Sequence, residues 1–220
     1  MRTVIFDLDG TLADTSGDLI AAANHCFRGL KLGDLLDPKA DALTAFHGGR
    51  AMLKLGFSRV DGYGADEIDR QYPVLLQAYA QNIDRHTRLY PGAVEAVEAL
   101  RSKGFAVGIC TNKPEALAET LLQRLGVRNL FASLIGADTL PTRKPDALPY
   151  LTAVERAGGI AERSFLLGDT DTDLKTSRAA GVPSVLVTFG PEGQAIARLE
   201  PDALLDNYDA LPDLAAKLLG

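Results

Sequence analysis

The chain has 220 residues, a length that suits one domain or one domain carrying a smaller insert. Apolar residues make up 46% and charged residues 24%, which favours a folded globular protein over a disordered one. The net charge of −6 and the pI of about 5.1 argue against a broad nucleic-acid-binding face, and the two cysteines, Cys26 and Cys110, exclude a disulfide scaffold.

The first predicted strand covers residues 3–6 and is followed by a long stretch of helical patterns. Apolar residues recur at helical spacing over 18–30, and Asp37 with Pro38 predicts the start of another helix that runs toward Phe46. Two more helices are expected, over 50–55 with a stop at Gly56 and over 66–85 with a kink at Pro73.

Strands and helices alternate in the rest of the chain. Continuous apolar runs, typical of strands covered on both faces, lie at 105–110, 133–135, 164–167, 184–189 and 203–205. Helices are predicted between them, at 91–103, 114–125 and 146–157. This alternation predicts an α/β fold with a Rossmann-like parallel sheet and right-handed crossovers.

The distance between the first two strands indicates an inserted domain. A βα crossover needs roughly 30 residues, and the helix at 91–103 already supplies one. About 70 residues remain, too many for a connecting loop and patterned as helices. We therefore expect an α/β core domain over 1–14 and 89–220, with a helical cap domain over 15–88.

Acidic residues follow the predicted strands, at the edge where α/β sheets bind ligands. Asp7 and Asp9 come directly after Phe6. Carboxylates so close together repel each other unless a cation balances them, so they indicate a metal site. The strand that ends at Leu167 leads into a third acidic group, Gly-Asp-Thr-Asp-Thr-Asp, over 168–173.

Polar residues of other kinds follow the remaining strands. Thr111 and Asn112 precede a predicted helix N-terminus, whose free N–H groups suit an anion, and Lys144 follows the third strand of the core. With the carboxylates, these residues match the needs of phosphoryl transfer. They offer oxygen ligands for Mg²⁺, positive charge for the phosphoryl oxygens, a carboxylate nucleophile and a second carboxyl as acid and base.

Four segments resemble, in order, the four motifs of the haloacid dehalogenase (HAD) superfamily. They are Asp-x-Asp-Gly-Thr-Leu-x-Asp at 7–14, Thr-Asn at 111–112, Lys-Pro at 144–145 and Gly-Asp-x-x-x-Asp at 168–173. The resemblance covers the whole chain. It implies a HAD-like core whose helical cap is inserted between the first and second motifs.

The resemblance implies catalytic roles for three residues. Asp7 is the implied nucleophile, which forms an aspartyl-phosphate, and Lys144 pairs with Asp7 and the phosphate. Asp9 is the implied general acid and base, and its backbone carbonyl is an implied Mg²⁺ ligand. Dehalogenases of the superfamily lack an acid at this second position, so Asp9 favours a phosphatase or phosphomutase, whose oxygen leaving group benefits from a proton.

The other motifs imply binding roles. Thr111 and the backbone around Asn112 would hold the phosphoryl group. Asp169 would be the main second carboxylate on the metal, and Asp173 would lie behind it or on a ligand water. Lys113 and Arg143 are interpreted as neighbouring charges that tune the potential of the site.

Within the superfamily, several segments are similar to phosphoglycolate phosphatases, namely 111–114, 136–138, 143–146 and 47–50. This implies a Mg²⁺-dependent phosphatase that hydrolyses a small phosphomonoester, with 2-phosphoglycolate as the favoured substrate. We hypothesise that Arg50 binds the substrate carboxylate from a cap loop opened by Gly48 and Gly49. The alternative is a solvated helix arginine that follows a simple helix break.

Other functions share the same residues. A β-phosphoglucomutase-like phosphosugar mutase would use the same catalytic set, and another small phosphate ester or pyrophosphate is an alternative substrate. The complete motif set argues against a purely binding protein. No apolar run approaches the ~18 residues of a membrane helix, and the N-terminal run is too short for a signal peptide. We therefore expect a cytoplasmic monomer or homodimer that binds neither membranes nor nucleic acid.

Overall fold

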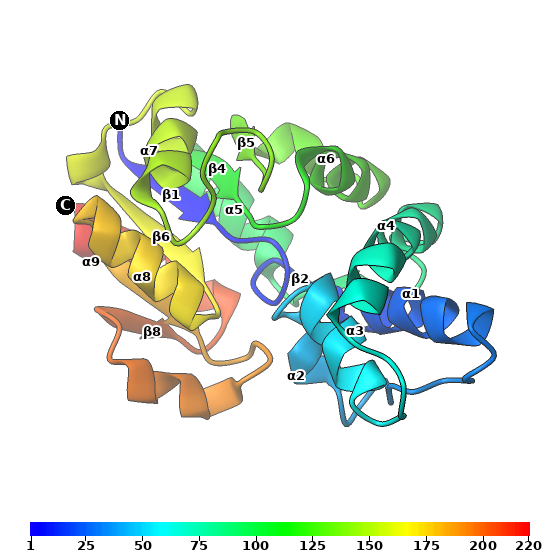
Figure 1. Ribbon diagram of the computed structural model, residues 1–220. Helices are drawn as coiled ribbons and strands as arrows, with labels where there is room; N and C mark the ends of the chain where they lie inside the picture. The colour runs from blue at the N-terminus through cyan, green and yellow to red at the C-terminus, as the bar shows by residue number, and fades with distance from the viewer. The chain divides into compact units, whose positions relative to one another are not determined.

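A six-stranded sheet forms the centre of the computed structural model, which describes all residues 1–220 (Figure 1). Its order is β5-β4-β1-β6-β7-β8, and every neighbouring pair is parallel. The strands are β1 (Thr3–Phe6), β4 (Ala106–Cys110), β5 (Ser133–Ile135), β6 (Ser164–Gly168), β7 (Ser184–Val187) and β8 (Ala203–Leu205). The predicted α/β fold with a parallel sheet is confirmed.

The central position of β1 determines where the polar loops meet. Phe6, the last residue of β1, is paired with Ile109 of β4 on one side and Leu167 of β6 on the other. The N–H of Asp7 extends the second pairing by donating to the Leu167 carbonyl at 2.8 Å. The loops after β1, β4 and β6 therefore leave the sheet at one edge, where the chain order reverses and α/β proteins bind ligands.

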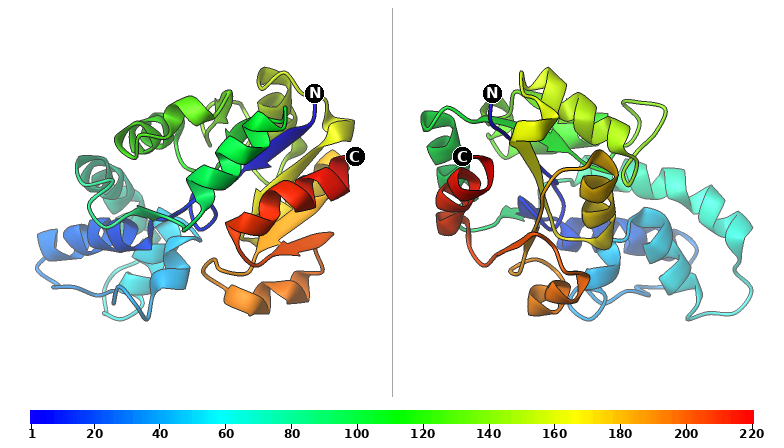
Figure 2. Two further views of the ribbon diagram at one scale, coloured as in Figure 1. Left: turned by 180° about the vertical axis from the view of Figure 1, so that it is seen from behind. Right: turned by 90° about the vertical axis from the view of Figure 1, so that its left-hand side faces the viewer.

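Helices cover both faces of this sheet. α7 packs on β5, β4 and β1, α8 packs on β6 and β7, and α5 packs on β4 and α9. Figures 1 and 2 show α7 and α8 on one face and α5 and α9 on the other. The core helices are α5 (Ala93–Ser102), α6 (Glu115–Arg124), α7 (Ala147–Arg156), α8 (Asp171–Ala180) and α9 (Leu211–Leu219). Short 3₁₀ helices lie at Arg128–Leu130, Ala161–Arg163, Gly193–Leu199 and Tyr208–Ala210.

The chain divides into two compact units. One consists of Met1–Ala13 with Leu89–Gly220, and the other of Asp14–Arg88. The second unit contains α1 (Ser16–Gly29), α2 (Ala42–Ala45), α3 (Gly49–Phe57) and α4 (Ala65–Gln81), and the short strands β2 (Ala13–Asp14) and β3 (Arg88–Leu89) form a separate sheet. No helix of either unit has the length and apolar character needed to span a membrane.

The inserted unit has its own apolar core. α1, α3 and α4 contact one another, and the Phe27 and Phe57 rings meet edge to face with centroids 5.1 Å apart. Other buried side chains of this core are Met52, Leu53, Leu75, Tyr79 and Ile83. The side chains that form this core thus come from one continuous stretch of chain.

Two helix boundaries predicted in this unit are wrong. The helix expected from Asp37 is reduced to α2, because the Asp37 carboxylate accepts hydrogen bonds from the N–H groups of Lys39 and Ala40 at 2.8 and 2.7 Å and forms a turn. Gly56 does not end a helix, since α3 continues through Phe57. A Cβ at Gly56 would lie 2.1 Å from Phe27 Cζ, so this glycine makes room for the ring.

A buried carboxylate joins the beginning and the end of the inserted unit. Asp18, in the first turn of α1, is only 3% exposed. It accepts hydrogen bonds from the N–H groups of His86 and Thr87 and from Thr87 Oγ1, at 2.8 to 2.9 Å. These contacts connect residues that are close to the two points where the chain enters and leaves the unit.

Candidate active site

Three buried carboxylates lie together at the carboxyl edge of the sheet. Asp7 follows β1, Asp169 follows β6, and Asp173 lies in the first turn of α8. One oxygen of each lies within 4.8 Å of the others. The end of β6 lies so close to the first turn of α8 that a Cβ at Gly168 would lie 2.3 Å from Asp173 Cγ. Sequence positions separated by more than 150 residues thus form one acidic cluster.

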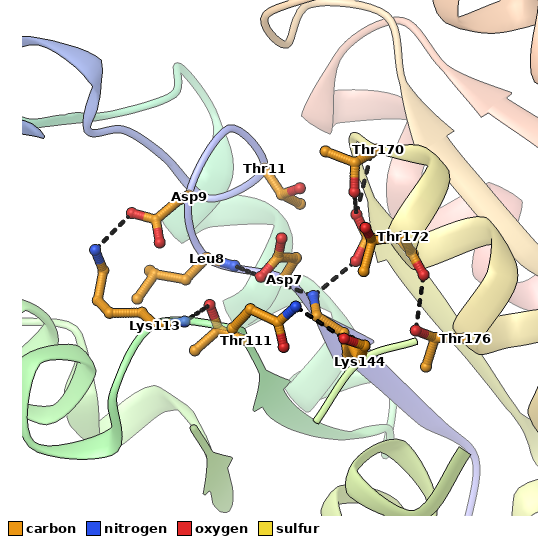
Figure 3. Close-up of polar contacts among 12 residues, drawn as sticks. Asp7, Leu8, Asp9, Thr11, Thr111, Lys113, Lys144, Thr170, Thr172 and Thr176 are labelled. Carbon is orange, nitrogen blue, oxygen red and sulfur yellow. Dashed lines mark hydrogen bonds and ion pairs between the residues drawn. The ribbon is translucent and has the colours of Figure 1, made fainter. Parts of the chain in front are cut away.

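A buried lysine reaches into this cluster from the loop that follows β5. Lys144 Nζ lies 3.0 Å from Asp7 Oδ1 and 2.6 Å from Asp173 Oδ1 (Figure 3). Burial lowers the pKa of Lys144, but the charges of Asp173 and Asp7 outweigh that effect and hold its pKa above the ordinary value. One ammonium among three carboxylates leaves a formal charge of −2, which a divalent cation would balance.

The environment disfavours ionisation of two of these carboxyl groups. Burial raises the pKa of Asp7 to about 6, and the charges of Asp173 and Asp9 add to this while Lys144 opposes it. Burial also raises the pKa of Asp169 well above its ordinary value, with further contributions from Asp173 and Asp7. A bound cation would remove this penalty by compensating the negative charge.

The two oxygens of Asp169 have different surroundings. Oδ1 accepts a hydrogen bond from Thr11 Oγ1 at 2.8 Å. Oδ2 is buried and accepts no hydrogen bond from the protein. Buried polar atoms without a partner are rare and costly, and a carboxylate oxygen is a preferred ligand of hard cations such as Mg²⁺. The donor set and this unpartnered oxygen fit a divalent metal site.

Asp173 is satisfied by the protein itself. Its Oδ1 accepts from Lys144, while Oδ2 accepts from Thr170 Oγ1 at 2.6 Å and from the N–H groups of Asp169 and Thr170. Thr170 and Asp173 thereby form a capping box at the start of α8. Asp173 thus fixes Lys144 and the loop of Asp169 at the same time.

The loop after β4 supplies the predicted phosphate-binding residues. Thr111 is buried, and its Oγ1 accepts a hydrogen bond from the N–H of Lys113 at 3.2 Å. Asn112 Nδ2 donates to the Lys144 carbonyl at 3.0 Å, which fixes the backbone of that lysine. The Asn112 side chain therefore has a partner in the protein, and the phosphate-binding role of its backbone stays a prediction.

Asp9 does not belong to the three-carboxylate cluster. Its Oδ1 lies 2.9 Å from Lys113 Nζ, and the two side chains are only 18% and 4% exposed. The sequence indicated no more than a neighbouring charge at Lys113, because the spacing of the motif does not reveal which carboxylate its ammonium reaches. Thr11, the hydrogen-bond donor to Asp169, was likewise missed, since a threonine in a turn is common.

Arg50 lies within the inserted unit, at the beginning of α3. It forms an ion pair with Asp69, and its guanidinium carbon lies 4.6 Å from the centre of the Tyr72 ring. Gly48 precedes the helix with φ +92°, so the two glycines mark a helix start and do not interrupt a helix. The substrate role of Arg50 stays a prediction.

The comparisons with known proteins define the class. The sequence matches the haloacid dehalogenase-like hydrolase family over residues 4–187, and the chain belongs to this family. A solved structure from Haemophilus somnus, described as a predicted phosphoglycolate phosphatase, has a TM-score of 0.85 at 24% identity and covers 97% of both chains. At that identity the match shows the fold.

Relatives of higher identity narrow the class. A phosphoglycolate phosphatase of Agrobacterium fabrum is 39% identical over 217 residues, which are 98% of this chain and 93% of that protein. The phosphoglycolate phosphatase of Mesorhizobium japonicum is 37% identical over 218 residues, 98% of this chain and 96% of its own. The chain is therefore an enzyme, a hydrolase of the same class as these phosphatases.

Proposed function

We propose that this enzyme hydrolyses a small phosphate monoester through an aspartyl-phosphate on Asp7 and with Mg²⁺. The leading candidate for the substrate is 2-phosphoglycolate. The observation that carries the proposal is the buried arrangement in which Lys144 contacts Asp7 while Asp169 retains an unpartnered oxygen. The relatives named phosphoglycolate phosphatase support the choice of substrate.

The metal would be held by oxygen atoms of two loops. Asp7 and Asp169 are the proposed side-chain ligands, with the backbone carbonyl of Asp9 beside them. Asp173 already accepts bonds at both oxygens, so we assign it contact through a ligand water. When bound, the cation would supply positive charge next to the phosphoryl oxygens, where negative charge accumulates during transfer.

In the first step, an oxygen of Asp7 attacks phosphorus and the bond from phosphorus to the ester oxygen breaks. Lys144 holds the Asp7 carboxylate in place and balances negative charge on the phosphoryl group. Thr111 and the backbone of Asn112 hold the phosphoryl oxygens. The leaving oxygen takes a proton from the carboxyl group of Asp9 and departs as the alcohol.

In the second step, water attacks phosphorus of the aspartyl-phosphate. Asp9, now a carboxylate, accepts a proton from that water, and the bond between phosphorus and the Asp7 oxygen breaks. Inorganic phosphate leaves, and both aspartates return to their starting protonation states. The two carboxyl groups thereby divide one difficult displacement into two easier ones.

A panel of small phosphate esters, assayed with and without Mg²⁺, tests the proposal. We expect phosphate release that depends on the metal, with 2-phosphoglycolate among the best substrates. Asp7→Asn removes the nucleophile and should lower kcat at least about 10³-fold, the scale of losing a nucleophile in a covalent mechanism. Lys103→Met, at an exposed ion pair with Asp213, is the matched control and should retain activity.

Three results would contradict parts of the proposal. Equal activity of Asp7→Asn and the unaltered enzyme would exclude Asp7 as the nucleophile. Full activity in the presence of a chelator would exclude the metal. Transfer of the phosphoryl group to a glucose phosphate in preference to water would favour the mutase.

A further inference from the structure

We infer that Lys113 is a positioning residue that holds the Asp9 carboxyl group apart from the metal-binding carboxylates and so keeps it available to the leaving oxygen. The inference rests on the proposed function, because it concerns the partner of the proposed acid and base. It starts from the buried Lys113–Asp9 ion pair of 2.9 Å, which the motif roles do not explain.

The backbone around Asp9 places its side chain near the acidic cluster. Asp9 is two residues after Asp7, and the loop is closed by hydrogen bonds from the N–H groups of Leu12 and Ala13 to the Leu8 carbonyl. In Figure 3 the Asp9 carboxylate is turned toward Lys113 and away from Asp7. The Asp9 carboxylate thus contacts the Lys113 ammonium and does not join the three-carboxylate cluster.

Lys113 is well anchored for such a role. Its N–H donates to Thr111 Oγ1 at 3.2 Å, and its carbonyl accepts from the N–H of Ala137 at 2.9 Å. Two residues further on, the Glu115 N–H donates to Asp138 Oδ1 at 2.7 Å. The chain from the Lys113 carbonyl to Glu115 is therefore fixed to the loop after β5, and the Lys113 N–H is fixed within its own loop.

Close packing against the loop after β5 limits how far the segment that carries Lys113 can shift. A Cβ at Gly136 would lie 2.4 Å from the backbone nitrogen of Glu115, so the two loops touch through their main chains. A side chain held on such a support can orient a neighbour accurately. Lys113 therefore orients Asp9 in the same way that Lys144 orients Asp7.

The electrostatics explain why Asp9 needs a partner. A divalent cation beside Asp7 would attract another nearby carboxylate, and a carboxylate that ligates the metal is lost as an acid for the leaving group. Removing the ammonium would take a close positive charge away from the largely buried Asp9 carboxylate. A neutral residue at position 113 should thus impair Asp9 although Asp9 itself is unchanged.

The experiment compares two leaving groups. Lys113→Met and Asp9→Asn are assayed on an alkyl phosphate from the panel and on p-nitrophenyl phosphate, whose phenolate leaves without a proton. Both variants should lose about 10²-fold or more in kcat/KM on the alkyl phosphate and less than about tenfold on p-nitrophenyl phosphate. The double variant should be no worse than Asp9→Asn, because the two residues act as a unit.

Three further variants complete the design. Lys113→Arg, which keeps the charge, should recover most of the activity, and Lys103→Met should behave as the unaltered enzyme does. Lys113→Gln replaces Lys113→Met if the latter does not fold, as judged by its melting temperature.

Equal losses on both esters, or losses that multiply in the double variant, would overturn the inference, since Lys113 would then act on the phosphoryl group directly. Unaltered enzyme that is folded but releases no phosphate from any ester would instead contradict the proposed function.

Discussion

The orientation of Asp169 depends on a chain of contacts within the core unit. Thr11 donates its hydroxyl to Asp169 Oδ1, and the Thr11 carbonyl accepts from the hydroxyl of Tyr208 at 2.7 Å. Tyr208 is itself buried against the Phe189 ring. Such outer contacts fix the direction of a metal ligand. They leave the second oxygen of Asp169 without a protein partner and available to the proposed cation.

The raised pKa values predict how metal binding depends on pH. The pKa of Asp7 is about 6 in the folded protein against an ordinary value of 3.8, so the folded state holds the extra proton. The metal-free protein therefore loses stability as pH rises from about 4 to about 6, and the raised pKa of Asp169 acts in the same direction. Because a cation competes with these protons, its stabilising effect should grow with pH.

The measurement is the melting temperature with Mg²⁺ minus the melting temperature with a chelator, taken from pH 5 to pH 8. We expect a small difference at pH 5 and a larger one at pH 7.5, since ligand binding adds to folding stability only where the ligand binds. Asp169→Asn, which removes a proposed ligand, should abolish the difference. A difference that does not change with pH would contradict the prediction.

At the level of elements, the packing of α1 against α3 depends on the absence of a side chain at Gly56. The Phe27 ring of α1 occupies the space in which a side chain at position 56 would begin. Glycine weakens the interior of a helix, and here the close packing of the ring compensates for it. This contact explains why α3 extends past the residue that otherwise signals a helix end.

Gly56→Ala should therefore destabilise the protein. The added Cβ would overlap Phe27, and overpacking of this kind costs about 1–3 kcal/mol in the free energy of unfolding. Gly29→Ala is the control, because a Cβ there meets nothing within 4 Å and should leave stability equal or slightly higher. Urea unfolding of both variants measures the effect. Equal stability of the two would show that the ring moves aside freely.

Five of the six strands of the large sheet could be predicted because each is a largely apolar run that is buried throughout, and β8 is a partly exposed edge strand. Helix ends were harder, since Asp37 and Gly56 are ordinary turn and stop signals whose effect depends on tertiary partners. α8 was not predicted, because Leu174 is its only long apolar side chain. α9 was omitted although its leucines follow a helical spacing.

The candidate site likewise contains residues that the sequence predicted and residues that it did not. The motif residues Asp7, Lys144 and Asp169 were predicted, and the structure brings them together. Thr11 and Lys113 were not given specific roles, because their partners lie on other loops and no local pattern in the sequence identifies them.

For the molecule as a whole, the inserted unit depends on a connection between its two ends. The Asp18 carboxylate accepts all of its hydrogen bonds from His86 and Thr87, almost 70 residues further along the chain. It is the kind of buried acceptor whose loss leaves several donors without partners. The same contact limits how far the ends of the unit can separate.

Asp18→Ala should lower the free energy of unfolding by about 2–4 kcal/mol, because buried donors of Thr87 lose their acceptor. Faster hydrogen exchange at the N–H of Thr87 should accompany the loss. Asp34→Ala, which breaks an exposed pair with Arg28, should change stability by less than about 1 kcal/mol. Losses of similar size in the two variants would contradict a special role for Asp18.

The central place of β1 has a consequence for synthesis on the ribosome. β1 is made first, yet its neighbours β4 and β6 begin only at Ala106 and Ser164. At translation rates of about 5–20 residues per second, one edge of β1 waits about 5–20 s for β4 and the other about 8–30 s for β6. The segment Asp14–Arg88 emerges in the meantime, so its helices can form while β1 is still an unpaired apolar strand. Chaperones that shield extended apolar segments would act on that intermediate.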